Sequence, residues 1–205
     1  MKIIESSIEV LQCVDGGEML KHIERCGRVA YKSEDKITEK SAEKFVAGII
    51  ERGHESVLEH ASITVKFICD RGVSHELVRH RIASYTQEST RYVDYKTGLT
   101  VIGIDPSVSD TGGARDHWEW AMKCCECAYQ MLIAAGHKPQ IARAVLPTCL
   151  KTEIIMTANL REWRHFFRLR TAKDAHPDMR RVACMALDEL RDRVPVVFDD
   201  IEVIT

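Results

Sequence analysis

Long apolar runs are absent from this 205-residue sequence, and none approaches the roughly 18 residues that a membrane-spanning helix needs. The first residues, Met1 to Glu5, also lack the hydrophobic region of a signal peptide, so we expect a cytoplasmic protein. No internal repeat, low-complexity tract or linker interrupts the chain, which predicts one domain over residues 1–205. The net charge is only -2, and this balance argues against general binding of nucleic-acid polymers.

Cysteine is plentiful, but its spacing does not predict a metal centre. The cluster at Cys124, Cys125 and Cys127 has no matching second half elsewhere in the chain. Others, such as Cys69 and Cys184, lie inside apolar patterns, where a free cysteine behaves as a small hydrophobe. We therefore expect reduced thiols and no metal.

The apolar pattern indicates helices together with a smaller number of strands. Helical spacing covers residues 18–31, 38–52, 114–135, 140–146, 159–170 and 178–194, and strand patterns cover residues 3–14, 61–70, 100–104 and 151–159. Ser74 is a plausible N-cap for a further helix that would run into Arg81. Arg79 and Arg81 would then lie about 200° apart, so they could hold different ligands or different parts of one.

The segment from Arg79 to Tyr92 concentrates charge and hydrogen-bonding groups. Its residues include three arginines, one histidine, two serines, two threonines, one glutamine and two tyrosines. Each arginine must keep its charge solvated or paired, and the hydroxyl and amide groups between them suit an anionic ligand such as a nucleotide phosphate. An exposed basic turn is the structural alternative for the same composition.

Residues 159–170 predict an amphipathic helix with Leu160, Trp163 and Phe167 on its apolar face. Arg170 lies close to this apolar stripe and cannot lose its proton, so it needs an anionic or carbonyl partner. It either extends outward from a helix end or faces a ligand. We expect the opposite face of the helix to carry Arg161, Arg164, His165 and Arg168.

Four motifs in order resemble those of the flavin-dependent thymidylate synthases (ThyX). The Arg79-His80-Arg81 triplet, followed after seven residues by Ser89-x-Arg91-Tyr92, resembles the signature of that family. Upstream, residues 53–60 (GHESVLEH) are similar to its GHE(S/T)xxEH segment. Downstream, residues 141–147 (IARAVLP) are similar to its IARxxLP segment, and residues 159–161 and 167–170 are similar to its last motif.

This resemblance implies a specific fold and reaction. Family members are homotetramers of α/β (α+β) subunits, so we expect a single domain with a central mixed or antiparallel sheet flanked by helices, and active sites at subunit contacts. They make dTMP from dUMP, with methylenetetrahydrofolate as the carbon donor and NADPH as the reductant through FAD. No enzyme nucleophile takes part, because a bound flavin carries the hydride chemistry.

The resemblance also implies the residues of the site. Arg170 is expected against the uracil ring, where it would stabilise negative charge at N3, and His54 is expected near the folate and flavin rings; these are the catalytic assignments. The flavin contacts would come from Ser56, Arg79, His80, Arg81, Gln87, Asn159, Arg161 and His165. The nucleotide contacts would come from Glu76, Arg79, Gln87, Glu88, Ser89, Thr90, Arg91, Arg143 and Arg170.

Several positions depart from the family pattern. Thr86 and Gln87 stand where many members have Asn and Glu, Glu76 stands in place of a common glutamine, and Ala30 replaces a common serine. A carboxylate at Glu76 near a nucleotide is unfavourable unless an arginine pairs with it. These departures require rearranged hydrogen bonds at individual positions.

Three alternatives remain beside this interpretation. A cysteine-dependent thymidylate synthase needs a reactive thiol in a Pro-Cys-His setting, whereas this chain has only Pro147-Thr148-Cys149 with no following histidine. A non-enzymatic nucleotide- or RNA-binding module would use the arginines, although aromatic stacking platforms are sparse near them. A family member that binds FAD and nucleotide but has lost turnover is the third.

Overall fold

The computed structural model describes residues 1–104 and 112–203, and the chain folds into two compact units. Unit 1 comprises Met1–Ser7, Phe67–Arg79 and Thr86–Ile154, and unit 2 comprises Ile8–Lys66, His80–Tyr85 and Ile155–Thr205. Each unit is assembled from three separate stretches of sequence. The expected single domain over residues 1–205 stays a prediction.

Two sheets are present among the described residues. The larger contains β2 (Ser7–Val10), β3 (Ser62–Asp70), β6 (Lys151–Asn159) and β4 (Ala83–Gln87), in the order β2-β3-β6-β4. In the smaller, β1 (Lys2–Ile4) pairs in parallel with β5 (Thr100–Ile102). Every second residue of β3 and β6 is buried, as their alternating sequences predict. The expected combination of helices with mixed sheets is confirmed.

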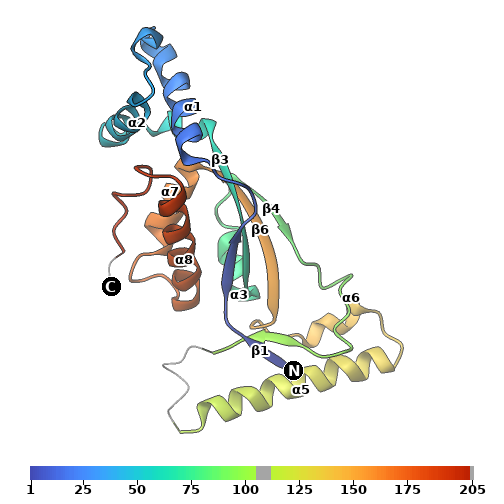
Figure 1. Cartoon of the computed structure of the whole chain (residues 1–205). Coiled ribbons are helices and arrows are strands. Elements are labelled where there is room, and N and C mark those ends of the chain that lie inside the picture. Colours follow the sequence, from blue (N-terminus) through green and yellow to red (C-terminus); the bar gives the residue numbers. More distant parts are fainter. Residues whose placement is uncertain (105–111, 204–205) are drawn as a thin grey trace. The chain divides into compact units, whose positions relative to one another are not determined.

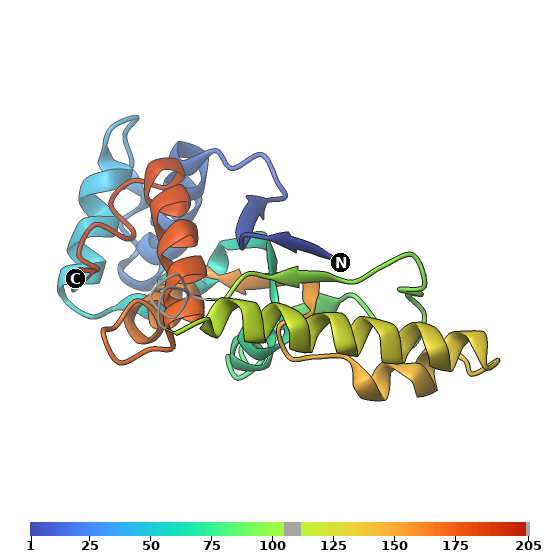
Figure 2. The same ribbon diagram turned by 90° about the horizontal axis from the view of Figure 1, so that it is seen from below.

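Unit 1 has its core between the small sheet and α5 (Ala114–Ala134). Tyr95, Leu99, Val101 and Tyr129 are buried together there, and α5 lies beside β1 and β5 in both views (Figures 1 and 2). Glu126 of α5 accepts a hydrogen bond from the Leu99 backbone N–H and pairs with the Met1 ammonium at 2.9 Å. The other helices in the described part of unit 1 are α3 (Arg71–Leu77), α6 (Pro139–Ala142) and the short η4 (Arg143–Val145).

Unit 2 is mainly helical. It contains α1 (Gly16–Arg28), η1 (Val29–Tyr31), η2 (Glu34–Lys36), α2 (Ser41–Glu51), η3 (Glu55–His60), α7 (Leu160–Arg170) and α8 (Pro177–Arg193). Helix α1 contacts α2 and η3, and α7 contacts η3 and α8 (Figure 1). The predicted apolar face of α7 is confirmed, because Trp163 and Phe167 are fully buried and stack at 5.6 Å. This packing fixes α7, which carries several of the expected site residues.

The Ser74 cap is the main error in the predicted elements. Asp70 caps α3 by accepting from the Val73 backbone N–H, while Ser74 lies within the helix and donates to the Arg71 carbonyl. Helix α3 ends at Leu77, so Arg79 and Arg81 are not on it, and strand β4 was not predicted at all. No helix in the described part of the chain is long and apolar enough to cross a membrane.

The start of α1 offers a test of unit 2 packing. Replacing Gly16 by Ala is expected to lower the free energy of unfolding by about 1–3 kcal/mol, because the new Cβ would lie 2.1 Å from the Arg193 backbone oxygen. Gly17→Ala is the matched control, since its nearest neighbour, Asp15 Oδ1, would be 3.4 Å away. Urea unfolding measures both variants, and equal loss of stability would contradict this packing.

Candidate functional site

The expected site residues are divided between the two units. Unit 1 carries Glu76, Arg79, Gln87, Glu88, Ser89, Thr90, Arg91 and Arg143; unit 2 carries His54, Ser56, His80, Arg81, Asn159, Arg161, His165 and Arg170. Each group has its own local geometry.

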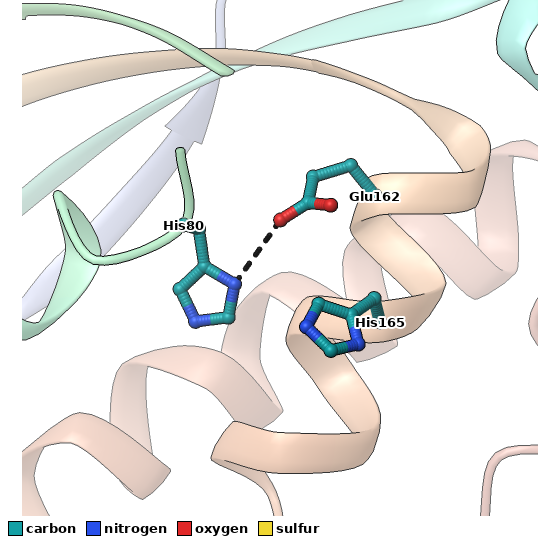
Figure 3. Close-up of side chains that lie close together, drawn as sticks. All are labelled: His80, Glu162 and His165. Atoms are coloured by element: carbon teal, nitrogen blue, oxygen red, sulfur yellow. Dashed lines mark hydrogen bonds and ion pairs between the residues drawn. The ribbon is translucent and has the colours of Figure 1, made fainter. Parts of the chain in front are cut away.

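In unit 2, His80 lies at the centre of a buried polar cluster. His80 and Glu162 are only 5% and 6% exposed, and His80 Nδ1 lies 3.3 Å from Glu162 Oε1 (Figure 3). On its other side, His80 Nε2 accepts a hydrogen bond from Arg170 Nε at 3.0 Å. The Phe166 ring packs edge-on against the imidazole at 4.9 Å. The cluster therefore joins the segment before β4 to both ends of α7.

The Arg170 contact determines the tautomer of His80. An arginine Nε–H can only donate, so the Nε2 atom that faces it must carry a lone pair. The proton of the neutral imidazole is then on Nδ1, from which it is donated to Glu162. Burial, with Arg170 and His165 nearby, lowers the pKa of His80 to about 4, which keeps the ring neutral at pH 7. Burial also raises the pKa of Glu162.

His80, Glu162 and His165 also have the spacing of a metal site. One ligand atom from each lies within 4.8 Å of the other two, and Glu162 and His165 come from neighbouring turns of α7 (Figure 3). However, His80 already donates its Nδ1 proton to Glu162, and the Arg170 cation donates to Nε2 of the same ring. A divalent cation would have to displace that proton next to a fixed positive charge, so the arrangement favours a hydrogen-bonded cluster. That no metal binds stays a prediction.

The position of Arg164 differs from the prediction that α7 has one apolar face and one charged face. Its side chain is fully buried, unlike those of Arg161, His165 and Arg168, with which we grouped it on one face. The guanidinium donates to Glu55 Oε1 at 3.0 Å, to Asp200 Oδ1 at 2.6 Å and to the Val197 carbonyl. Arg168 Nη2 adds a second cation at 2.9 Å from Glu55. Helix α7 thus holds both η3 and the segment after α8.

This arrangement positions the 53–60 motif. Glu55 lies between His54 and Ser56, which are both exposed, so a fixed Glu55 carboxylate limits where its two neighbours lie. Burial acts to raise the pKa of Glu55, but Arg168 and Arg164 outweigh it and lower the pKa overall. Arg164 lowers the pKa of Asp200 by a hydrogen bond. Both carboxylates are therefore ionised at neutral pH, where they balance the buried cation.

The other unit 2 candidates are of two kinds. Asn159 caps α7, where its Oδ1 accepts from the Glu162 backbone N–H at 2.8 Å, and Arg161 pairs with Glu59 at 2.5 Å. Arg81 and His165 are exposed, and the described residues give Arg81 no side-chain partner. Asn159 is therefore engaged as the N-cap of α7, whereas Arg81 presents its charge to solvent.

In unit 1, the two residues after Thr86 are engaged within the protein. Gln87 Nε2 donates to Ser74 Oγ at 2.8 Å and to Thr152 Oγ1 at 3.2 Å. Glu88 accepts from the Tyr95 hydroxyl at 2.6 Å and pairs with Lys151 at 3.1 Å. The departure at Gln87 is therefore accommodated by hydrogen bonds inside unit 1.

Beyond Glu88 the chain forms a tight basic turn. The backbone N–H groups of Tyr92 and Val93 both donate to the Ser89 carbonyl, and the Ser89 hydroxyl accepts from the Arg91 N–H. Arg91 is exposed, with its guanidinium carbon 5.5 Å from the centre of the Tyr92 ring. Thr90 is buried and accepts a long hydrogen bond from Arg143 at 3.4 Å. Arg79 is exposed and Glu76 is half-buried.

The Asp200 contact gives a test of how the buried cation is balanced. Asp200→Asn is expected to lower the free energy of unfolding by about 1–2 kcal/mol at pH 7, because Arg164 loses one of its two carboxylates. The folded-state pKa of Asp200 is lowered, so its contribution is present above the unfolded value near 3.8 and is lost as the pH falls. The difference in free energy of unfolding between the wild type and Asp200→Asn should become smaller below about pH 4. Asp199→Asn, at an exposed neighbour, is the control, and equal effects would contradict this role.

Comparison with known proteins identifies the family of the chain. The family described as thymidylate synthase complementing protein (Thy1) matches residues 12–196. Proteins named flavin-dependent thymidylate synthase are 40% identical in Geobacter sulfurreducens, over 81% of this chain and 72% of the relative, and 39% identical in Pyrococcus furiosus, over 82% and 70%. One from Mycobacterium tuberculosis is 37% identical over 93% of this chain and 82% of its own length.

A solved structure has the same fold. The UMP/dUMP methylase PolB from Streptomyces cacaoi, bound with 5-Br dUMP, gives a TM-score of 0.81 over 97% of this chain and 96% of that chain, at 23% identity. These matches confirm the resemblance that the four motifs predicted. The chain therefore belongs to the Thy1 family, whose relatives with 37–40% identity are named flavin-dependent thymidylate synthases.

Proposed function

We propose that this protein is a flavin-dependent thymidylate synthase that converts dUMP to dTMP. In this proposal methylenetetrahydrofolate supplies the carbon and NADPH supplies the reducing equivalents through FAD. The names of the relatives support the reaction, and dUMP fits the nucleotide analogue bound by PolB. The observation that carries the proposal is Arg170, a permanent cation whose Nε is bound to a buried, neutral histidine.

The donors of unit 2 fit a flavin dinucleotide chemically. Arg81 and Arg161 are exposed guanidinium groups, which bind diphosphates by charge-assisted hydrogen bonds, and Ser56 adds an exposed hydroxyl. His165 lies on the exposed side of α7, 5.8 Å from the buried His80 ring. Within unit 2 these four residues would hold FAD, while the buried His80 and the helix cap Asn159 would support them from inside the protein. When bound, the flavin supplies hydride transfer.

The turn in unit 1 fits a nucleotide phosphate. Ser89 already has its carbonyl engaged by two backbone N–H groups, so the turn is fixed before a ligand arrives. Arg91 and Arg143 present exposed guanidinium groups beside it, and such forked cations bind phosphate through paired hydrogen bonds. Gln87 and Glu88 would contact the nucleotide through the hydrogen-bonding capacity that their contacts inside the protein do not use. Glu76 is expected near the nucleotide, next to an arginine.

The chain's own residues would act on the pyrimidine through charge. Arg170 would stabilise the negative charge that develops on the uracil ring, which accelerates a reaction when the cation is already in place. His54, exposed beside the fixed Glu55, would lie near the rings of the cofactors. A cysteine nucleophile is disfavoured, since burial raises the pKa of Cys149 to about 11 and leaves little thiolate at pH 7.

Self-association is part of the proposal, because α5 carries an exposed apolar stripe. Trp120 and Met131 are 68% and 67% exposed, and the exposed Cys124 and Cys127 lie between them at helical spacing. Water-exposed apolar side chains in a row are typical of a surface that another chain covers. We propose that α5 contacts a second copy of this chain within a homotetramer.

Two alternatives make different predictions for the same preparation. A member of the family that has lost turnover would retain flavin and nucleotide but form no dTMP. A nucleic-acid-binding module using Arg79, Arg81 and Arg91 would bind polymers with a steep salt dependence and no flavin.

The proposed reaction is tested first by a visible spectrum of protein that has been incubated with FAD and then desalted. Retained flavin bands that bleach with NADPH under anaerobic conditions, followed by dTMP formation from dUMP and methylenetetrahydrofolate, are the expected result. Colourless protein, or reduced flavin without dTMP, would contradict the proposal.

Arg170→Ala should lower turnover about 100-fold or more while the protein retains its flavin. Arg25→Ala, at an exposed arginine of α1, should leave both unchanged, and equal loss of flavin and turnover in Arg170→Ala would make Arg170 a binding or folding residue.

The α5 surface is tested by a charge placed in the stripe. Trp120→Glu and Met131→Glu should each reduce the mass measured by light scattering from four chains to a smaller assembly, because a buried carboxylate opposes association. Gln130→Glu adds the same charge to another exposed position of α5 and should leave the mass unchanged. A tetramer that survives both stripe variants would exclude α5 from the interface.

A further inference from the structure

We propose that Glu162 is a positioning residue for Arg170 and that it acts through His80. The inference rests on the proposed function, in which Arg170 is the group that acts on the pyrimidine. Glu162 is not among the residues that the family motifs suggested, and its carboxylate is directed to the buried imidazole (Figure 3).

His80 and Glu162 are held in place by burial. His80 and Glu162 are among the few buried polar side chains in the described part of unit 2, and each is hydrogen-bonded to the other. A buried polar pair reduces stability unless its hydrogen bonds are satisfied, so the pair has little freedom to rearrange. The Tyr85 hydroxyl donates to the His80 carbonyl at 2.8 Å and also fixes the backbone of this residue.

The directions of the two hydrogen bonds of the His80 ring favour one tautomer. Arg170 can only donate, so His80 must offer a lone pair at Nε2 and a proton at Nδ1, and Glu162 is the acceptor that stabilises this tautomer. If the proton were on Nε2 instead, the N–H groups of His80 Nε2 and Arg170 Nε would face each other. Protonation of His80 would place two cations in contact. Among the described residues, the charged or titratable groups that contact His80 are Glu162, His165, Arg170 and the Tyr85 hydroxyl.

The hydrogen bond to His80 Nε2 also orients Arg170. A guanidinium is planar, so a hydrogen bond at Nε restricts rotation about the Cδ–Nε bond and sets the plane of both terminal nitrogens. Loss of the acceptor at Nε2 leaves the charge of Arg170 unchanged but removes this restraint on the plane. We therefore expect loss of Glu162 to affect the transition state more than nucleotide binding.

The first experiment is a double-mutant cycle in the flavin-loaded enzyme. Glu162→Gln keeps the size of the side chain, but its amide can accept from, or donate to, either His80 tautomer. It should lower kcat for dTMP formation by about tenfold, with little change in KM for dUMP and in flavin content. In a His80→Asn background, which has no atom in the place of Nε2, the same change should have no further effect. The proposal would be overturned if the two substitutions lower kcat independently, so that their fold-losses multiply in the double variant. An unchanged kcat in Glu162→Gln would overturn it as well.

A pair of His80 variants separates the two contacts of the ring. His80→Gln can place an amide oxygen near the position of Nε2, and so retains an acceptor for Arg170. His80→Asn can reach only toward Glu162. The Gln variant should therefore keep more turnover than the Asn variant, although both lose the imidazole. The reverse order would mean that the Glu162 contact, and not the Arg170 contact, is what turnover requires.

The second measurement does not depend on turnover. In protein labelled with ¹⁵N-histidine, the His80 imidazole shifts, assigned by their loss in His80→Asn, should be those of the neutral Nδ1–H tautomer. In Glu162→Gln the Nε2–H tautomer should appear beside it, because the amide, unlike the carboxylate, can also donate to Nδ1. An Nε2–H tautomer in the wild type, or an unchanged tautomer in the variant, would overturn the proposal even if dTMP is formed. Wild-type protein that forms no dTMP would contradict the proposed function, while this spectrum would still decide whether Glu162 sets His80.

Discussion

The buried guanidinium of Arg164 is the constraint on which unit 2 depends. A cation without solvent destabilises a protein by several kcal/mol unless its partners are close and well directed. Arginine cannot avoid this by losing its proton, so Glu55, Asp200 and the Val197 carbonyl must all be present. These partners lie on η3 and on the segment after α8, far from Arg164 in sequence. One buried charge therefore fixes three parts of the chain, including the segment that carries His54 and Ser56.

Helix α7 provides the rigid support for these interactions. Its buried aromatic face holds it in place, and its period of 3.6 residues turns Glu162 toward His80 and Arg164 toward Glu55. Asn159 begins the helix, and Arg170 is its last residue. The same helix thus supplies a structural cation, a polar contact to a buried histidine and the arginine proposed to act on substrate. A shift of α7 would disturb all three together.

The sequence predicted the elements better than it predicted their polar contacts. Periodicity located the strand from Lys151 to Asn159 and the helix α5 because a single buried face repeats along each of them. The Ser74 cap was wrong because Asp70, four residues earlier, is an equally good capping residue and α3 is too short for periodicity to decide. Arg164 was grouped with Arg161, His165 and Arg168 because helical position and residue type do not distinguish a buried, paired arginine from a solvated one. Its partners lie 36 and 109 residues away, and no local pattern reveals them.

The arginines of the chain show why composition alone was ambiguous. An exposed basic turn and a ligand site have the same residue types, and only burial and pairing separate them. Arg164 and Arg168 are bound to carboxylates of the protein, so their charges are already balanced. Arg79, Arg81 and Arg91 are exposed, and the described residues give none of them a carboxylate partner. Because an unbalanced guanidinium is what an anionic ligand can neutralise, the first pair maintains the fold and the second group remains available for phosphate. The exposed arginines of the Arg79–Tyr92 segment are therefore the ones that the proposed function assigns to ligands, whereas its buried histidine, His80, connects the segment to α7.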